Sequence, residues 1–148
     1  MRYYGSFHID GPSSQAETNP YAFTFSHDGT KVFIHGITLD DLYSYDLTTA
    51  WDVTTVDFTT IARKVDWETG YIFGMAFNGD GTKLFTCDDA DKTVREHTLT
   101  TAYDVTTISD HASGVKLSDY ASQHIHLNAY ARPYAIQFNN DGTRMFIS

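Results

Sequence analysis

Apolar residues in this chain gather in short, nearly continuous runs and not at the 3.6-residue spacing of a helix. Successive side chains of a strand point to opposite faces of its sheet, and the runs at 21–26 and 31–35 would place apolar residues on both faces. We therefore expect strands that are covered on both faces. His27-Asp28-Gly29-Thr30 lies between them, and its Asp-Gly pair supplies the positive φ that a tight hairpin turn needs. Two further strands are predicted over Leu42–Leu47 and Val56–Lys64.

This unit occurs three times along the chain. Segments 21–30, 73–82 and 134–143 share one pattern, and each is followed by a basic residue, an apolar residue and Phe. The first two copies are 52 positions apart and the last two are 61 apart, so nine additional residues lie between Thr107 and Phe138. The recurring turn residues are Asp28, Gly29, Thr30, Asp80, Gly81, Thr82, Asp141, Gly142 and Thr143.

The size of the unit indicates the fold class. Four short strands in a unit of about 50 residues match one blade of a β-propeller. The sequence therefore predicts an all-β fold, a β-propeller with four-stranded antiparallel blades, of which about two and a half are present. Its predicted parts are a strand at 2–9, blade repeats at 21–64 and 73–116, and a partial blade at 134–148. A β-sandwich is the alternative, but it does not require three copies of one unit.

The motifs of the repeat resemble a known family. Phe-x-x-Asp-Gly-Thr-Lys-x-Phe, followed by Leu-Thr-Thr-Ala-Trp/Tyr-Asp-Val-Thr-Thr at 47–55 and 99–107, is similar to β-propeller repeats of phage structural and tail-fibre proteins and of bacterial secreted proteins. The resemblance covers nearly the whole chain. It implies a non-enzymatic binding or structural module, on a virion or an extracellular surface, that presents variable loops to a protein partner or a glycan.

The predicted ring is incomplete. Propellers close with about four to eight blades, and the third repeat stops inside its second strand, at Phe146-Ile147-Ser148. We expect the ring to be completed by the remaining blades of a longer chain or by other protein subunits, and the position of the stop favours the longer chain.

Composition narrows the choice of partners. Nineteen acidic residues against ten basic ones give a formal net charge of −9, which argues against nucleic acid as a partner. The single cysteine, Cys87, has no internal disulfide partner and no zinc-ligand spacing around it, and the sequence predicts no cofactor. The sequence has no apolar run of membrane-spanning length. Its first residues contain no apolar signal region, so the cytoplasm is an alternative location.

Variation among the repeats predicts a binding face. In a four-stranded antiparallel blade, the turns after the first and third strands share one end, and the other loops share the opposite end. The first end repeats almost verbatim, whereas loops 36–40 and 88–92 and spacers 10–20 and 109–133 differ. Since a scaffold varies what it shows to a partner, this second end is the candidate binding face. Its candidate residues are Asp40, Asp41, Asp88, Asp89, His111, Tyr120, His124, His126, Tyr130 and Arg132.

Each candidate also has a plainer interpretation. The Asp-Gly-Thr turns faintly match a calcium loop, but a distal Glu ligand is missing, so we expect hairpin turns. Trp51 and Tyr103 occupy equal places and are expected to pack between blades, although an exposed Trp can stack on a sugar. His124-Ile125-His126 suits a transition metal, yet a polar surface loop is the stronger expectation. The acidic pairs are interpreted as solvated loop charge, and Cys87 as a small buried residue.

An enzyme is the alternative function. A propeller hydrolase of the sugar-lactone type would hold a metal in its central channel with carboxylates or amides from several blades. Glu17, Asn19, Glu68 and Arg132 precede the first strands of the blades but do not recur in register. The sequence therefore favours the non-enzymatic module.

Overall fold

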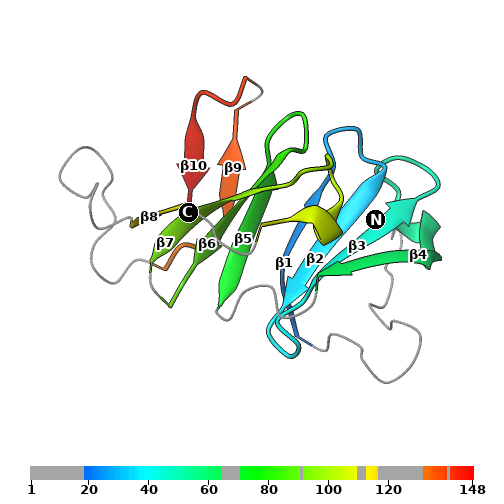
Figure 1. The fold of residues 1–148 in the computed structure, drawn as a ribbon, viewed down its shortest axis with the longest axis horizontal. Coiled ribbons are helices and arrows are strands. Elements are labelled where there is room, and N and C mark those ends of the chain that lie inside the picture. Colours follow the sequence, from blue (N-terminus) through cyan, green and yellow to red (C-terminus); the bar gives the residue numbers. More distant parts are fainter. Residues whose placement is uncertain (1–18, 65–70, 91, 110–112, 117–131, 140) are drawn as a thin grey trace, which may run out of the picture.

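The computed structural model describes residues 19–64, 71–90, 92–109, 113–116, 132–139 and 141–148. Over these residues the chain is all-β, with three antiparallel sheets and two short 3-10 turns (Figure 1). None of the three sheets closes on itself within this part of the chain. The described residues also contain no helix long and apolar enough to cross a membrane.

Each sheet follows the chain order of its strands. The first sheet is β1 (Pro20–Phe25), β2 (Lys31–Gly36), β3 (Leu42–Leu47) and β4 (Val56–Lys64). The second is β5 (Ile72–Phe77), β6 (Lys83–Asp88), β7 (Thr93–Thr98) and β8 (Ser113–Lys116). The third is β9 (Ile136–Phe138) with β10 (Met145–Ile147). The 3-10 turns are η1 (Val53–Thr55) and η2 (Val105–Thr107).

The predicted strands and their antiparallel order are confirmed for the first two repeats. Observed strand ends agree with the predicted ones to within about a residue in the first sheet, because turn residues with special backbone angles delimit each strand. Residue 108 of the second repeat forms only an isolated bridge to Leu99 where the first repeat begins β4. The predicted strand at 2–9 lies outside the described residues.

The Asp-Gly-Thr segments form the predicted hairpin turns. Gly29, Gly81 and Gly142 have φ of 71°, 73° and 70°. In the first turn the Asp28 Oδ1 atom accepts a hydrogen bond from the Thr30 N–H at 3.0 Å and another from the Thr30 hydroxyl at 2.8 Å. The same two bonds recur in the other turns. The carboxylate therefore serves its own turn, as the hairpin interpretation predicts.

Successive sheets pack face to face by one repeated rule (Figure 1). We define the forward face of a sheet as the one that meets the following sheet, and the backward face as the opposite one. Phe33 on the forward face of the first sheet meets Phe77 of the second, with ring centroids 4.5 Å apart at 54°. Phe85 meets Phe138 of the third sheet in the same way, at 4.6 Å and 53°. These pairs occupy equal places in the repeat, so the two interfaces have the same construction.

The sheets approach most closely at their first strands. Strand β1 lies against β5, and β5 lies against β9. Gly74 on β5 permits the second approach, because a Cβ atom there would lie 2.9 Å from the Ala135 Cα and the Ile136 N. Farther out, η2 of the second repeat packs against β3 and β4 of the first sheet. A 3-10 turn thus fills the space that opens between neighbouring sheets.

Candidate binding face

The sheets have two distinct ends. At the turn end, the Trp51 N–H donates to the Gly29 carbonyl at 2.9 Å, which joins the turn after β3 to the turn after β1. At the loop end, the Ile37 N–H donates to the Asn19 carbonyl at 3.2 Å, and the Asp89 N–H donates to the Tyr71 carbonyl at 3.0 Å. The separation of repeated turns from variable loops is therefore present as the repeat predicts.

Asp41 at the loop end is fully buried and paired. It forms an ion pair with the Arg63 guanidinium, whose Nε also donates to Asp41 Oδ2 at 2.6 Å. The Tyr43 hydroxyl donates to the same oxygen at 3.0 Å, and Arg63 lies over the Tyr43 ring. Burial, then the bond to Asp41, raises the pKa of Tyr43 well above its usual range. Asp41 is therefore part of the framework of the first sheet.

The acidic pair of the second repeat is also tied to its own chain. Asp88 and Asp89 are both buried. The Ala90 N–H donates to Asp88 Oδ1 at 2.6 Å, and the Lys92 ammonium forms an ion pair with Asp89. The expectation of solvated loop charge is therefore wrong for Asp41, Asp88 and Asp89. Asp40 differs, since it is only half-buried and has a positive φ of 53°.

The end of spacer 109–133 is anchored at the loop end. Arg132 Nε lies 3.5 Å from Asp89 Oδ2, and the Cys87 thiol donates to the Pro133 carbonyl at 3.5 Å. Cys87 is buried, as predicted, and burial raises the pKa of its thiol to about 11, which leaves it a poor nucleophile. The other candidates of this spacer lie outside the described residues; they are His111, Tyr120, His124, His126 and Tyr130.

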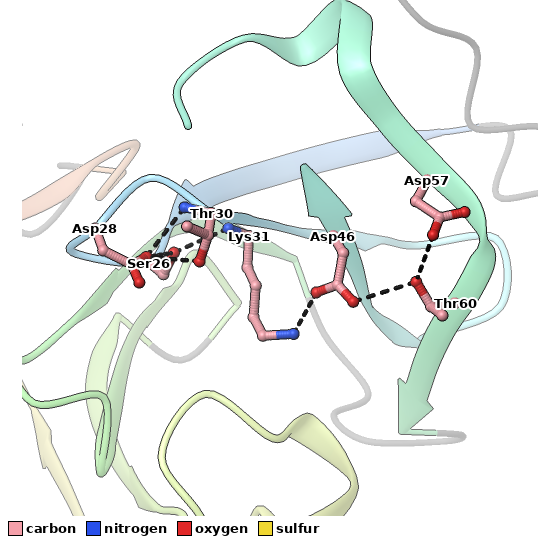
Figure 2. A network of polar contacts seen from close by, with 7 residues as sticks. All are labelled: Ser26, Asp28, Thr30, Lys31, Asp46, Asp57 and Thr60. Carbon is pink, nitrogen blue, oxygen red and sulfur yellow. Dashed lines mark hydrogen bonds and ion pairs between the residues drawn. The ribbon is translucent and has the colours of Figure 1, made fainter. Parts of the chain in front are cut away.

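A polar network stiffens the turn end of the first sheet (Figure 2). The Ser26 hydroxyl donates to Asp28 Oδ1 at 2.7 Å and accepts from the Lys31 N–H at 2.9 Å. The Lys31 ammonium pairs with Asp46, which also accepts from the Thr60 hydroxyl at 3.2 Å. Figure 2 shows these side chains as one line from the hairpin turn across β3 to β4. The line therefore connects the hairpin turn to β3 and β4.

The turn end also carries a groove that the sequence analysis did not single out. It has a volume of about 590 Å³ and is lined by all three repeats. Thr24, Ala76 and Gln137, which occupy equal places on β1, β5 and β9, lie along it. Its lining side chains include hydroxyls, amides, the His27 imidazole, the Trp51 indole and the Asp141 carboxylate, which suit hydrogen bonding to a polar ligand. Nowhere in the described part of the chain do three His, Cys, Asp or Glu side chains gather to hold a metal.

Tyr103 packs between two sheets, as predicted. Its ring centroid lies 5.1 Å from Phe77 and 6.2 Å from Phe33. Its hydroxyl donates to the Gly79 carbonyl and accepts from the His27 N–H of the first sheet, both at 3.2 Å. Trp51, at the equal place of the first repeat, covers Gly29 but stays largely exposed. The aromatic side chain at this place in the repeat therefore packs between two sheets in the second repeat but is largely exposed in the first.

Two features of the site were not predicted, although the sequence contained a signal for each of them. Tyr43 and Arg63 are directly opposed on β3 and β4, so the predicted hairpin would have placed Arg63 beside the Tyr43–Asp41 segment. The groove joins positions that are equal in the repeat, so the period alone could have grouped them. What the sequence could not supply was the depth of burial at either place.

Known proteins add information on the fold alone. No family model matches the chain, and no curated protein matches its sequence. Among solved structures the chain is similar to hydrazine synthase from Kuenenia stuttgartiensis, with a TM-score of 0.53 and 16% identity over 97% of this chain. The similarity covers 32% of that protein's chain, so this chain spans about a third of its length. The same all-β arrangement thus recurs inside a larger protein.

Proposed function

We propose that this chain is a segment of a β-propeller. The support is the repeated interface, in which the same Phe pair meets at the same distance and angle in two successive contacts. Equal interfaces rotate successive sheets by equal amounts, and contact at the first strands puts the rotation axis beside β1, β5 and β9. Electron microscopy of the assembled or longer protein should show a ring with a central channel. An open, uncurved stack of sheets would contradict the proposal.

We further propose that the propeller is a non-enzymatic module that binds through its loop end. One observation carries this proposal. Arg132 contacts Asp89 and the Cys87 thiol donates to the Pro133 carbonyl, so the C-terminal end of spacer 109–133 is attached to the second sheet at the loop end. Binding residues often lie in variable segments that a rigid scaffold positions. Tyr, His and Arg residues in this spacer combine flat contact area with hydrogen-bond donors, and a glycan or a protein surface accepts both.

We propose, from the resemblance of the repeat motifs to phage and bacterial secreted propellers, that such a module lies on a virion or an extracellular surface. There the His and Tyr residues of this spacer would meet host or bacterial glycans. The proposal therefore predicts binding of the intact chain to members of a glycan array, without any metal dependence.

The test removes nine residues of spacer 109–133 without changing the sheets. Deleting residues 119–127 restores the spacing of the first two repeats, and a matched variant replaces the same nine residues with Gly and Ser. Both variants should keep the far-ultraviolet circular dichroism and the thermal midpoint of the natural chain, because loops tolerate length changes at little cost. Both should lose binding to the glycans that the natural chain recognises.

Two results would overturn the loop-end proposal. One is an intact chain that binds no glycan on the array, and the other is a shortened chain that binds as well as the intact one. Stoichiometric metal in the purified protein, measured by mass spectrometry, would favour the channel-metal enzyme instead.

A further inference from the structure

A row of aromatic rings crosses the loop end, where the first strands of the three sheets begin. Tyr21, Phe73 and Tyr134 occupy equal places in the three repeats. The ring centroid of Phe73 lies 4.9 Å from that of Tyr21 and 5.1 Å from that of Tyr134. Since β5 lies between β1 and β9, these contacts join all three repeats (Figure 1). We call these residues, together with Tyr71 beside Phe73, the aromatic row.

The backbone sets the direction of two rings of the row. Between Pro20 and Ala22 strand β1 advances two residues while β2 advances one, so Tyr21 is the extra residue of a β-bulge. Phe73 is the extra residue of the same bulge in β5. Bulges commonly redirect a side chain, and here the two rings at bulges meet each other across neighbouring sheets. The first two repeats therefore place their aromatic residue by the same device.

The aromatic row remains accessible to solvent. Tyr71 is 50% exposed and Tyr134 is 53% exposed, while Phe73 between them is half-buried. Tyr71 directly precedes β5, and the second sheet has a described neighbour on each of its faces. The exposed surface of Tyr71 is therefore not a sheet face that a further sheet would cover. Adjacent exposed rings of this kind mark an interaction site.

A charged pair accompanies the row at the loop end. The Asp89 N–H donates to the Tyr71 carbonyl at 3.0 Å, and Arg132, which lies 3.5 Å from Asp89, is two positions before Tyr134. The Arg132 side chain is 60% exposed, and a guanidinium has five N–H donors, so its contact with Asp89 leaves donors for a ligand. The site thus offers flat apolar rings together with hydrogen-bond donors. The net charge of −9 disfavours an anionic ligand.

We infer that the aromatic row is a stacking platform for a neutral oligosaccharide, with Arg132 donating to its hydroxyl groups. The inference rests on the glycan binding proposed for the loop end, and it names the residues that make the contact. A sugar ring has an apolar C–H face and a polar edge, so stacking on Tyr71 and Tyr134 removes apolar surface from water while the hydroxyls stay free to bond. A ligand of several sugar units fits best, because the row extends across three repeats.

Isothermal titration calorimetry of the full chain tests the platform. The probes are cellohexaose, chitohexaose and maltohexaose, which are neutral, and hexagalacturonate, which is anionic. The natural chain should bind at least one neutral probe, and hexagalacturonate more weakly than that probe at low salt. Tyr71→Ser and Tyr134→Ser should each weaken binding of the neutral probe about tenfold, because a stacking ring is lost. Tyr71→Phe keeps the ring and should bind nearly as well as the natural chain.

The matched control is Trp51→Ser, which removes a 60% exposed aromatic side chain at the turn end and should leave binding unchanged. Circular dichroism should show that all variants are folded, since the substituted side chains are largely exposed.

Three results would overturn the inference. They are a natural chain that binds none of the neutral probes, folded Tyr71→Ser and Tyr134→Ser chains that bind as well as the natural chain, and a loss of binding in Trp51→Ser alone. Glycan binding that depends on residues 119–127 but not on Tyr71 or Tyr134 would contradict the platform and leave the loop-end proposal standing. Binding that depends on Tyr71 and Tyr134 but survives the deletion of 119–127 would have the opposite meaning.

Discussion

At the residue scale, one short motif recurs along the described chain and makes the same local hydrogen bond each time. Six Asp-x-Thr segments of the described chain fold alike, with a carboxylate oxygen that accepts from the backbone N–H of the Thr two positions on. They begin at Asp28, Asp52, Asp57, Asp80, Asp104 and Asp141. The carboxylate is the acceptor in every case, so the motif depends on its negative charge. Protonation should therefore weaken several turns together.

Acid should destabilise the protein in a window that these bonds define. Hydrogen bonds from the Thr30 N–H, then from Ser26 and Thr30 hydroxyls, lower the pKa of Asp28 from 3.8 to about 2. Thr bonds also lower the pKa values of Asp52, Asp57, Asp80 and Asp141. A carboxyl group whose pKa is lower in the folded state stabilises the fold above its unfolded value. That stability should disappear as the pH falls from about 4 to about 2.

Urea unfolding across this range measures the effect. Asp28→Asn should show a smaller loss of unfolding free energy between about pH 4 and 2 than the natural chain. His97 gives a separate loss at higher pH, because burial lowers its pKa from 6.5 to about 4 and protons then favour the unfolded chain. Both proteins share that loss. Identical pH dependence of the two proteins below about pH 4 would contradict the role of Asp28.

Two glycines separate backbone strain from packing. Gly81 and Gly142 have nearly the same positive φ, but a Cβ at Gly81 would lie 2.3 Å from the Tyr103 ring, whereas Gly142 has open space. Gly142→Ala should cost about 1 kcal/mol of unfolding free energy from the left-handed conformation alone. Gly81→Ala should cost at least about 1 kcal/mol more, since the ring must move. Equal costs in thermal or urea unfolding would show that the Tyr103 contact is not stabilising.

At the element scale, the turn after β7 connects two sheets through one side chain. The Tyr103 hydroxyl bridges the Gly79 carbonyl of its own sheet and the His27 N–H of the first sheet. This ties the ends of β1 and β5 together at the edge of the turn-end groove. Since the ring also packs on Phe77, its position does not depend on the hydroxyl alone. Removing only the hydroxyl therefore tests the bridge without emptying the interface.

Tyr103→Phe should destabilise the protein by about 1 kcal/mol, the usual net value of a hydrogen bond. Hydrogen exchange of the His27 amide should become faster, because that N–H loses its acceptor. The amide of Gly142, in the turn of the third sheet, is the internal control and should keep its rate. An unchanged rate at His27 would show that the bridge does not form in solution.

At the scale of the whole molecule, residues at the same place in the repeat should contribute unequally to stability. Phe33 is completely buried between two sheets, whereas Phe146 occupies the equal place on an exposed face. Phe33→Ala should cost about 3–5 kcal/mol, the usual range for a buried Phe. Phe146→Ala should cost less than about 1 kcal/mol in dilute solution, because little packing is lost. Thermal unfolding at low protein concentration compares the two, and similar costs would contradict the packing order of the sheets.

The loop end shows where prediction from the sequence stopped. The repeat separated the turn end from the loop end correctly, because alternate connections of an antiparallel sheet emerge at opposite ends. The charged residues Asp41, Asp88 and Asp89 were interpreted as solvated, but each is buried against a partner. Arg63 lies twenty-two positions from Asp41, and only the pairing of β3 with β4 brings the two together. The binding role of the loop-end residues stays a prediction.

The sequence by itself determined the all-β class, the four-strand unit, the strand ends and the hairpin turns. These depend on local chemistry, namely the covered faces of apolar runs and the positive φ of Gly after Asp. Only the tertiary structure decided which copy of a repeated residue is buried. Phe33, Phe85 and Phe146 follow the same pattern in the sequence, yet their exposure rises from the first to the third. Burial depends on whether another sheet lies against that face, and the residues of one repeat carry no information about its neighbour.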